Sequence, residues 1–244
     1  MLENRKGQQV PQVTFKVFNN GEWTDVTTDY LFKGKNVVLF ALPGAYTPTC
    51  SSTHLPRYNE LAPIFKANGV DNIICLSVND TFVINAWAKD QHSDHITLIP
   101  DGNGDFSEKM GLLVDKSAIG FGKRTWRYSM YVEDGTIKQM FIEPEQDGDP
   151  FEVSDADTML KYLYPNAEKP SRVTIFTRKG CPHCARAKSL LSDNSMHYEE
   201  ITIGPEVTQS TLQAVANTTA TPQVFIDGKL VGGADDLEKW VNSR

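Results

Sequence analysis

The segment FALPGAYTPTC, residues 40–50, constrains the fold of this chain more than any other. The apolar run at residues 37–40 is typical of a strand that is buried on both faces. A turn with proline and glycine follows, and Thr47 and Pro48 then carry the signals of a helix N-cap and of a first helical residue. We therefore expect Cys50 in the first turn of a helix that begins where a buried strand ends.

A thiol at that position is placed for chemistry. The first N–H groups of a helix have no partner within it, and the helix dipole favours an anion there. Both effects favour the thiolate, which is the nucleophilic form of cysteine. A lone cysteine is more often one more small buried residue. Here the strand end, the turn and the capped position of Cys50 together favour a reactive residue.

A second reactive segment, TRKGCPHC at residues 177–184, also follows a predicted strand and opens a predicted helix. The helix start and the nearby cations Arg178 and Lys179 favour the thiolate of Cys181. Cys184 lies one helical turn later and can form a disulfide with Cys181. The alternative is a metal-ligand pair, but zinc sites usually need four ligands and the sequence has no second Cys-x-x-Cys pair. The context therefore indicates a thiol–disulfide site.

Between the two reactive segments lies a linker. Residues 164–170, YPNAEKP, contain two prolines and no apolar periodicity. We place one domain at residues 1–164, the linker at 165–170 and a second domain at 171–244. Strand and helix patterns alternate in both domains, which predicts an α/β fold for each.

The individual elements follow from periodicity and from turn signals. In the first domain, strands are expected at residues 10–18, 23–26, 37–40, 73–78, 96–99, 127–132 and 136–142. Helices are expected after Cys50 to about residue 69, bent or broken at Pro56 and Pro63, and at 80–90, 107–110 and 154–163. In the second domain, strands are expected at 172–176, 197–201, 223–226 and 229–231, and helices at 184–191, 205–216 and 234–241. Cys75 falls inside a buried strand and is interpreted as structural.

Charge and composition exclude several classes of function. The net charge of −7 and the absence of a basic segment argue against a nucleic-acid partner. No apolar run approaches the length of a membrane span, and the first residues do not form a signal peptide, so a cytoplasmic location is expected. The acidic segment at residues 101–105 resembles a calcium loop, but Phe106 and Leu112 stand where that loop needs glycine and glutamate. No metal site is predicted.

Two further features of the second domain suit a charged peptide. The Thr221-Pro222 pair precedes a strand and is suited to a cis peptide that presents backbone groups. Residues 232–236, GGADD, open the last helix, where N–H groups can hold a carboxylate and Asp235 an ammonium group. Each feature is weak alone. Together they fit the two charged ends of a γ-glutamyl peptide.

With the CPHC segment, these features make residues 171–244 resemble the glutaredoxins over nearly their whole length. The resemblance implies a thioredoxin-like fold, glutathione as reductant and Cys181 as nucleophile. The family's usual aromatic residue is replaced by His183, which either tunes the thiolate or is simply an exposed polar substitute. The resemblance also implies a set of glutathione contacts, namely Arg178, Thr221, Pro222, Ala234 and Asp235.

The first domain resembles the peroxiredoxins, in particular the subfamily of short atypical two-cysteine enzymes. The motifs that carry the resemblance are PGAYTPTC at residues 43–50, LSVND at 76–80 and RYSM at 127–130. It implies a second thioredoxin-like fold in tandem. It also implies Cys50 as the peroxidatic cysteine, Thr47 and Arg127 as its partners and Pro43 as its shield. Arg124 is the less favoured alternative to Arg127 and is interpreted as a solvated surface charge.

One departure from that subfamily shapes the functional prediction. Enzymes of that subfamily often resolve the sulfenic acid with a second cysteine late in the domain, but residues 119–164 of this chain contain no cysteine. A sulfenic acid at Cys50 then needs an outside thiol. Glutathione is expected to supply this thiol. The attached domain is then expected to remove the glutathionyl group through Cys181, as the order of domains in bacterial peroxiredoxin–glutaredoxin fusions implies. The expected enzyme reduces H2O2 and alkyl hydroperoxides, has no tightly bound cofactor and forms a homo-oligomer, either dimer or tetramer.

Two other functions remain open at this point. The first domain can be a catalytically silent dimerisation module that carries a general glutathione-dependent disulfide reductase. Alternatively, the CPHC site can hold an iron–sulfur cluster between subunits as a carrier. The complete set of Pro43, Thr47, Cys50 and Arg127 favours the peroxidase. Whether Cys184 is required, as a dithiol route demands, also stays open.

Overall fold

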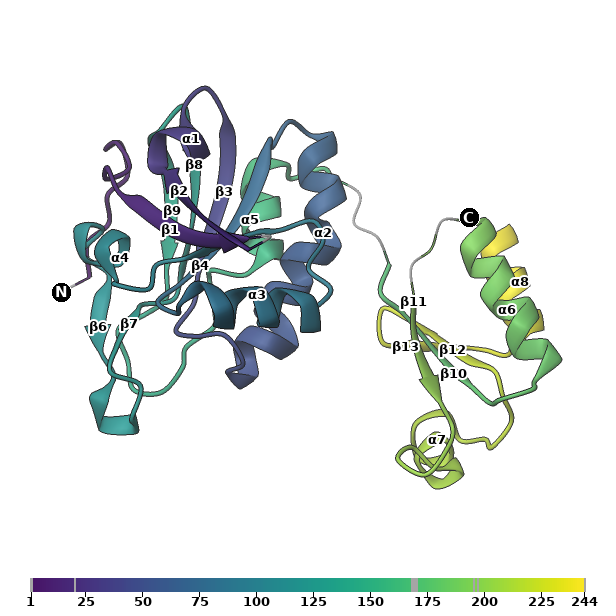
Figure 1. Ribbon diagram of the computed structural model, residues 1–244. Coiled ribbons are helices and arrows are strands. Elements are labelled where there is room, and N and C mark those ends of the chain that lie inside the picture. The colour runs from purple at the N-terminus through teal and green to yellow at the C-terminus, as the bar shows by residue number, and fades with distance from the viewer. Residues whose placement is uncertain (1, 20, 168–170, 195, 197, 244) are drawn as a thin grey trace. The chain divides into compact units, whose positions relative to one another are not determined.

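The computed structural model describes residues 2–19, 21–167, 171–194, 196 and 198–243. The chain divides into two compact units, Met1–Glu168 (unit 1) and Lys169–Arg244 (unit 2), and each is described by itself (Figure 1). Both are α/β units of the thioredoxin-like class that the sequence predicts.

Unit 1 is built on a five-stranded sheet of order β5-β4-β3-β8-β9. The three strands β3 (Asn36–Ala41), β4 (Asn72–Ser77) and β5 (Thr97–Pro100) are parallel, whereas β8 (Tyr128–Glu133) pairs antiparallel with both β3 and β9 (Thr136–Ile142). The central strand β3 therefore has neighbours on both sides, β4 and β8. Its apolar sequence is the reason, since a strand in this place is covered on both faces.

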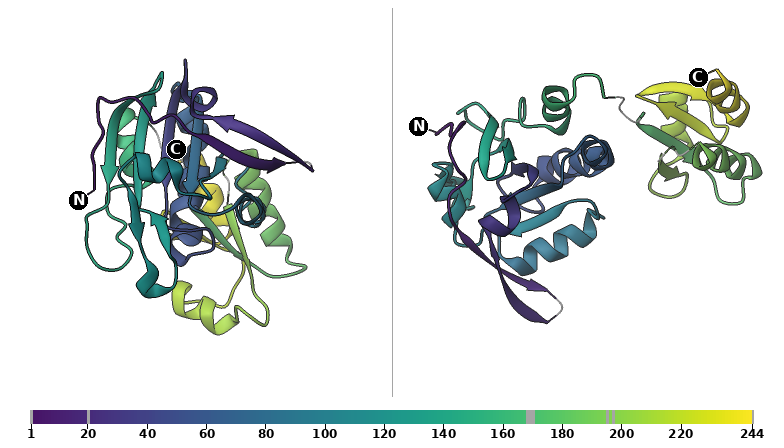
Figure 2. Two further views of the ribbon diagram at one scale, coloured as in Figure 1. Left: turned by 60° about the vertical axis from the view of Figure 1, so that its left-hand side comes forward. Right: turned by 90° about the horizontal axis from the view of Figure 1, so that it is seen from above.

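The remaining elements of unit 1 cover the sheet or extend it. The helical elements are α1 (Thr28–Phe32), α2 (Leu55–Ala67), α3 (Thr81–Asp90), α4 (Asp105–Lys109), α5 (Ala156–Leu163) and the 3₁₀ turn η2 (Ser117–Ile119). Two hairpins complete the unit, β1 (Thr14–Asn19) with β2 (Glu22–Thr27) and β6 (Leu113–Asp115) with β7 (Lys123–Thr125). The β1–β2 hairpin projects from the body of the unit (Figure 2). The sequence patterns do not reveal β6 and β7, because three-residue strands carry too little periodicity.

Side chains alternate along β3, so the sheet has an apolar core on each face. Val37 and Leu39 belong to one core, with residues of β1, α1 and α4. Val38 and Phe40 belong to the other, with residues of α2, α3 and α5. This period of two is what strand geometry imposes. The same alternation holds in β8, where Tyr128, Met130 and Val132 belong to the first of these cores.

The helix after Cys50 runs on through its prolines. A π-helical turn, Cys50–His54, leads directly into α2, so Pro56 lies inside a continuous helix, as Pro63 does. The helix is broken at neither proline. Asp80 caps α3 by accepting from the N–H groups of Phe82 and Val83, as its position predicts. The predicted start of the last helix of unit 1 is two residues early, because Asp155 is its cap.

Unit 2 is a four-stranded sheet of order β11-β10-β12-β13. Its strands are β10 (Val173–Thr177), β11 (Tyr198–Thr202), β12 (Gln223–Ile226) and β13 (Lys229–Gly232), and only the β10–β11 pair is parallel among the pairs described. Its helices are α6 (Pro182–Asp193), α7 (Gln209–Ala216) and α8 (Ala234–Asn242). Helices α6 and α8 pack on one face, and Leu212 of α7 belongs to a smaller core with Phe176. The predicted helix at 205–216 begins four residues too early.

The start of the predicted linker packs on unit 1. Tyr164 and Ala167 lie against the core of α2 and α5, and the Ala167 N–H donates to the Tyr164 carbonyl at 3.0 Å. Residues 168–170, the rest of the predicted linker, lie outside the described residues. None of the helices in the described ranges is long and apolar enough to cross a membrane.

Helices α2 and α5 are joined by an ion pair whose loss is expected to lower the local stability. Arg57 donates to both carboxylate oxygens of Asp157, at 2.7 and 2.8 Å, and the Arg57 side chain is only 10% exposed. Asp157→Ala removes two charge-assisted hydrogen bonds and is expected to cost about 1–3 kcal/mol of local stability. Asp25→Ala, which breaks an exposed pair with Lys16, is expected to cost under about 1 kcal/mol. Amide hydrogen exchange of peptides from both regions measures each effect, and equal acceleration by the two substitutions contradicts the prediction.

Candidate active site

The turn that follows β3 is held by contacts from two other elements. Asn79, just after β4, accepts at Oδ1 from the Ala45 N–H at 3.0 Å and from the Ser77 hydroxyl at 2.6 Å. Tyr46 has a left-handed φ of 62°, and its hydroxyl donates to Asp90 at the end of α3 at 2.7 Å. A non-glycine residue in that region of φ costs free energy and persists only where its surroundings fix it. The turn is therefore a rigid approach to the helix.

Thr47 serves this turn and does not cap the helix with its side chain. Its hydroxyl donates to the Gly44 carbonyl at 2.8 Å. Its carbonyl accepts from the Ser51 N–H at 3.0 Å, and the helix begins at Pro48 as the sequence predicts. The predicted side-chain cap is wrong, because the tight turn brings the Gly44 carbonyl within reach of the hydroxyl.

Cys50 lies at the head of the helix and is fully buried. It begins a π-helical turn, Cys50–His54, in which the Leu55 N–H donates to the Cys50 carbonyl. Such turns are frequent at functional sites. Cys50 is 0% exposed, and half-buried Pro43 lies in the turn that precedes it. The thiol is thus held at a helix start and shielded from bulk water.

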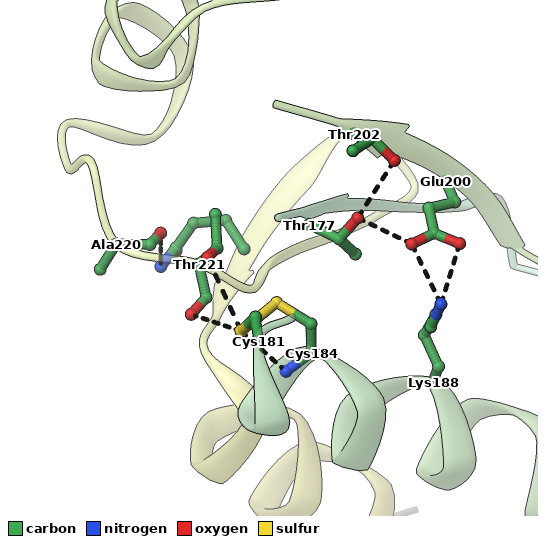
Figure 3. The surroundings of a disulfide bond; sticks show 9 residues. Thr177, Cys181, Cys184, Lys188, Glu200, Thr202, Ala220 and Thr221 are labelled. Carbon is green, nitrogen blue, oxygen red and sulfur yellow. Dashed lines mark hydrogen bonds and ion pairs between the residues drawn. A yellow bond between two sulfur atoms is a disulfide. The ribbon is translucent and has the colours of Figure 1, made fainter. Parts of the chain in front are cut away.

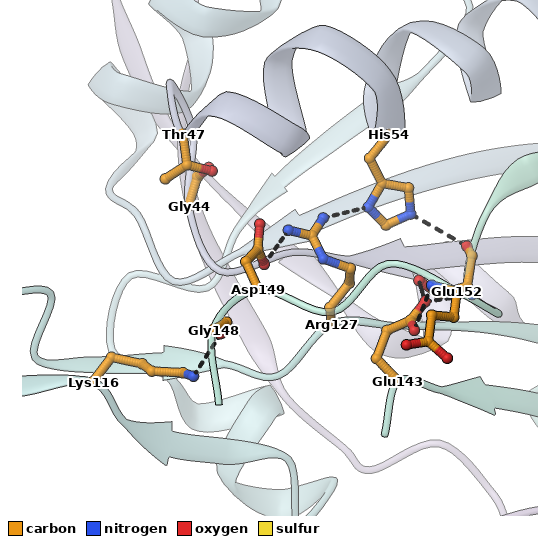
Figure 4. Close-up of polar contacts among 10 residues, drawn as sticks. Gly44, Thr47, His54, Lys116, Arg127, Glu143, Gly148, Asp149 and Glu152 are labelled. Atoms are coloured by element: carbon orange, nitrogen blue, oxygen red, sulfur yellow. Dashed lines mark hydrogen bonds and ion pairs between the residues drawn. The ribbon is translucent and has the colours of Figure 1, made fainter. Parts of the chain in front are cut away.

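Arg127 brings a buried positive charge to Cys50. It lies just before β8 and is 1% exposed. Its Nη1 donates to His54 Nδ1 at 3.0 Å and its Nη2 donates to Asp149, whereas Nε has no partner among the described residues (Figure 4). Burial acts to lower the pKa of Arg127, but the negative charges of Cys50 and Asp149 outweigh it and raise the pKa. The guanidinium is therefore charged.

Cys75 is the other free cysteine of the described chain, and it is a poor nucleophile. It lies in β4 and is 1% exposed. Burial, and secondarily the neighbouring Cys50, raises the pKa of Cys75 well above its usual value. Because the thiolate is the reactive form, the structural interpretation of Cys75 is supported.

His54 is a site residue that the sequence analysis did not single out. It is fully buried, and burial, with the charge of Arg127 second, holds its pKa well below the usual value. Arg127 can only donate, so Nδ1 of His54 accepts, and Nε2 carries the proton that goes to the Ser154 carbonyl at 3.2 Å. The spacing of four residues from Cys50, one helical turn, is the signal that points to it.

A buried carboxylate orders the segment that carries this carbonyl. Glu143 is 1% exposed and accepts from the N–H groups of residues 152–154 and from the Ser154 hydroxyl, at 2.6 to 2.9 Å. The Ser154 carbonyl then accepts from Tyr58 at 3.0 Å as well as from His54. The segment has no periodic pattern, so no sequence signal reveals this contact.

Arg124 is not the solvated surface charge that the sequence suggests. Its Nε donates to the Phe121 carbonyl at 2.9 Å, and Nη1 donates to the Val78 carbonyl. The side chain is half-buried in the β6–β7 hairpin. Arg124 thus ties that hairpin to the end of β4, while Arg127 is the arginine beside Cys50.

The second site of the chain lies at the start of α6. Cys181 is the N-cap residue, its sulfur accepts from the Cys184 N–H at 3.2 Å, and the two cysteines form a disulfide (Figure 3). Cys181 is half-buried and Cys184 buried, so Cys181 is the sulfur within reach of a partner. The helix begins at Pro182, two residues earlier than predicted. His183 is exposed, in agreement with the polar-substitute interpretation.

The other predicted contact residues gather around this disulfide. The Thr221-Pro222 peptide is cis, and the Thr221 carbonyl oxygen and hydroxyl oxygen lie 3.6 and 3.8 Å from the Cys181 sulfur (Figure 3). A Cβ built on Gly233 would lie 3.9 Å from the Pro222 carbonyl oxygen, so the start of α8 adjoins the same turn. A groove passes beside the disulfide. Its lining includes Thr177, Arg178, Lys179, Cys181, Lys188 and Glu200.

Asp235 and Ala234 open α8 behind the N-cap residue Gly233, and no side chain caps these N–H groups. Asp235 accepts from Arg186 of α6, and both side chains are exposed. This hydrogen bond, with the charges of Arg186 and His183, lowers the pKa of Asp235. Asp235 is therefore an accessible carboxylate at the start of α8.

Comparisons with known proteins agree for both units. The Redoxin family model matches residues 5–160, and the Glutaredoxin family model matches residues 173–231. The hybrid peroxiredoxin hyPrx5 of Haemophilus influenzae is 57% identical over 239 residues, which is 98% of this chain and 99% of that protein. Reduced Prx3 from Vibrio vulnificus in complex with H2O2 is 40% identical, with a TM-score of 0.62 over 66% of this chain and 99% of that one. A 1-Cys peroxiredoxin from Plasmodium falciparum is 34% identical, with a TM-score of 0.63 over 67% and 100%.

The neutral state of His54 gives unit 1 a pH-dependent stability. In the unfolded chain His54 binds a proton below its usual pKa of 6.5, whereas in the folded chain it does so only at much lower pH. The unfolded state therefore binds more protons below this value. The free energy of unfolding should fall with decreasing pH by up to about 1.4 kcal/mol per pH unit from this residue.

His54→Asn removes that contribution, so its stability should fall less steeply than the wild type below pH 6.5. Urea unfolding at a series of pH values measures the slopes. Tyr58→Phe, which also loses a hydrogen bond to Ser154, is the control that should keep the wild-type slope. Parallel profiles for wild type and His54→Asn would contradict a neutral buried imidazole.

Proposed function

Because this chain belongs to the peroxiredoxins, as a hybrid with a glutaredoxin domain behind its redoxin domain, we propose that it reduces peroxides at Cys50 with electrons from glutathione. Its peroxidase class follows from its family. The observation that carries the glutathione dependence is the distribution of thiols. Cys50 has only the buried strand residue Cys75 as a second free cysteine in unit 1, whereas unit 2 holds a redox pair in which Cys181 is half-buried and Cys184 is buried.

The first step is the reduction of the peroxide. The Cys50 thiolate attacks one peroxide oxygen, an S–O bond forms, and the O–O bond breaks. The leaving oxygen takes a proton and departs as water or as an alcohol, and Cys50 becomes a sulfenic acid. An in-line attack of this kind needs a fixed nucleophile and donors for the oxygens. Arg127, with its free Nε–H, supplies charge and a donor, and Pro43 and Thr47 shape the rigid turn.

The next steps return Cys50 to its thiol. Glutathione condenses with the sulfenic acid, so an S–S bond forms and water leaves. Cys181 as a thiolate attacks the glutathione sulfur of that mixed disulfide and releases Cys50. A second glutathione then attacks the mixed disulfide on Cys181 and departs as glutathione disulfide. Cys184 can instead displace glutathione and form the Cys181–Cys184 disulfide, which two glutathiones reduce.

The groups around Cys181 suit glutathione as the ligand. The Thr221 backbone, at the cis peptide with Pro222, is placed to pair with the extended cysteinyl residue of the tripeptide. The start of α8 at Ala234 offers N–H groups for the γ-glutamyl carboxylate, and Asp235 offers a carboxylate for its ammonium. For Arg178, which lines the groove, we propose a contact with the glycine carboxylate.

The joining of both units in one chain raises the concentration of each near the other. Tethering by a short linker gives effective concentrations on the order of millimolar. We propose a cytoplasmic enzyme that works as a homo-oligomer, in which transfer between subunits is a second route. Reducing conditions in that compartment suit free Cys50 and a recyclable CPHC pair.

The three cysteines should fail at different steps. Cys50→Ser is expected to abolish peroxide consumption with glutathione, glutathione reductase and NADPH. Cys181→Ser is expected to keep one stoichiometric reaction with peroxide. Its turnover is expected to fall at least about tenfold, because the nucleophile that attacks the mixed disulfide is lost. Cys184→Ser keeps turnover if the monothiol route operates. Unchanged peroxide consumption by Cys50→Ser would refute the proposed function.

Two neighbouring carboxylates test the glutathione site. Asp235→Ala is expected to raise the KM for glutathione roughly tenfold, since it removes a charge-assisted contact with the ammonium group of the tripeptide. The next residue, Asp236, pairs with Lys239, and Asp236→Ala should leave the KM for glutathione nearly unchanged. Steady-state kinetics with a small disulfide substrate and varied glutathione measures both. Equal changes in the two variants would contradict the assignment of Asp235.

A further inference from the structure

We propose that His54 and Asp149 are positioning residues of the peroxide reduction, because they hold the Arg127 guanidinium by two of its three nitrogens and leave the third for the reacting groups. This inference rests on the proposed role of Arg127. The guanidinium has five N–H donors in a fixed plane. His54 takes one from Nη1 and Asp149 takes one from Nη2, so two contacts fix that plane and three donors remain (Figure 4).

The imidazole is itself fixed in the orientation that accepts. Its Nε2–H donates to the Ser154 carbonyl at 3.2 Å, which sets the proton on the nitrogen away from Arg127. The rings of Phe40 and Phe151 lie 4.9 and 4.8 Å from the ring of His54, centroid to centroid. A side chain held on three sides in this way presents a preorganised acceptor.

Asp149 belongs to a segment that is braced along its length. We call residues 148–154 the brace. Lys116 donates to the Gly148 carbonyl at 3.5 Å at one end, and Glu143 binds the N–H groups of residues 152–154 at the other. Between them, the ring of Phe151 lies 5.4 Å from the Arg127 guanidinium carbon. The brace thus delivers the Asp149 carboxylate, an aromatic face and the carbonyl that orients His54 to one cation.

The two partners differ in what they contribute. Asp149 is charged and its side chain is 41% exposed, so it offsets part of the cost of the buried guanidinium. His54 is uncharged, so it contributes direction and not charge. A protonated imidazole would have no acceptor for Arg127 and would place a second cation 3.0 Å from it. The groups that face His54 from the packed elements are Arg127, Tyr58, Phe40, Phe151 and the Ser154 carbonyl.

A double-mutant cycle separates positioning from mere packing. The measurement is the second-order rate constant of reduced protein with H2O2, from rapid quenching and the mass of the Cys50 sulfenic acid. His54→Leu is expected to lower it about 10- to 100-fold, the range for a misplaced catalytic group. In an Arg127→Gln background the same substitution should cost less than about threefold, because residues that act as a unit are not additive. His54→Asn, which restores an acceptor oxygen, should recover most of the loss.

Asp149→Ala leaves the buried core intact and tests the same conclusion independently. It should lower the rate constant several-fold with Arg127 present and have no effect in the Arg127→Gln background. Tyr58→Phe, the matched control, loses a hydrogen bond to the same Ser154 carbonyl but removes no donor or acceptor that binds Arg127, and should react at the wild-type rate.

The outcomes are distinguishable. An equal fold-loss from His54→Leu in both backgrounds, with no rescue by asparagine, would show that His54 only packs and would overturn the positioning role. A wild-type rate for Arg127→Gln would overturn the proposed role of Arg127, and the positioning role with it. Non-additive losses with rescue by asparagine support the inference.

Discussion

A positive charge buried in unit 1 is the constraint on which the rest of that unit depends. Moving an ion out of water costs roughly several kcal/mol, even after the protein relaxes around it, unless partners surround the charge. Arg127 is 1% exposed, and its partners come from two separate segments: the π-helical turn that holds Cys50 and His54, and the brace. The irregular stretch between β9 and α5 supplies one of these partners, Asp149. It has no regular secondary structure, yet Glu143 fixes it with hydrogen bonds as short as those of a sheet.

The two reactive cysteines occupy similar local positions and face different surroundings. Both begin a helix after a strand, where backbone N–H groups favour an anion. Cys50 is fully buried beside a guanidinium, whereas Cys181 is half-buried beside a groove and a cis peptide. The first environment suits a small reactant with two oxygens. The second suits a peptide that pairs with the backbone and carries charges at both ends.

Much of the fold is predictable from the sequence because it rests on local patterns. The apolar run of β3, the Asp80 cap and the CPHC helix start all identify their elements. The errors have physical causes. The hydroxyl of Thr47 donates to a carbonyl inside the turn instead of capping the helix, and the helix continues through Pro56 directly after a π-helical turn.

The site is predictable only in part, because half of it is assembled by long-range contacts. Cys50 and Arg127 are marked by motifs, and the spacing of His54 offers a signal. Arg127 contacts Asp149, which belongs to a different segment of the chain. Glu143 anchors the brace, which is a stretch without periodicity. Neither choice of partner follows from propensity, since the fold decides which buried donors and acceptors meet.

The full burial of Cys50 has a consequence for how the chain senses its surroundings. A sulfur with no exposed surface admits a molecule of two oxygens far more readily than a tripeptide disulfide. In the proposed cycle the reduced thiol of Cys50 is thereby insulated from glutathione disulfide, and exchange with the glutathione pool takes place at the half-buried Cys181 instead. The chain thus separates two kinds of information. Under the proposed function, unit 1 would respond to the flux of oxidant, whereas unit 2 would follow the redox potential of the thiol pool.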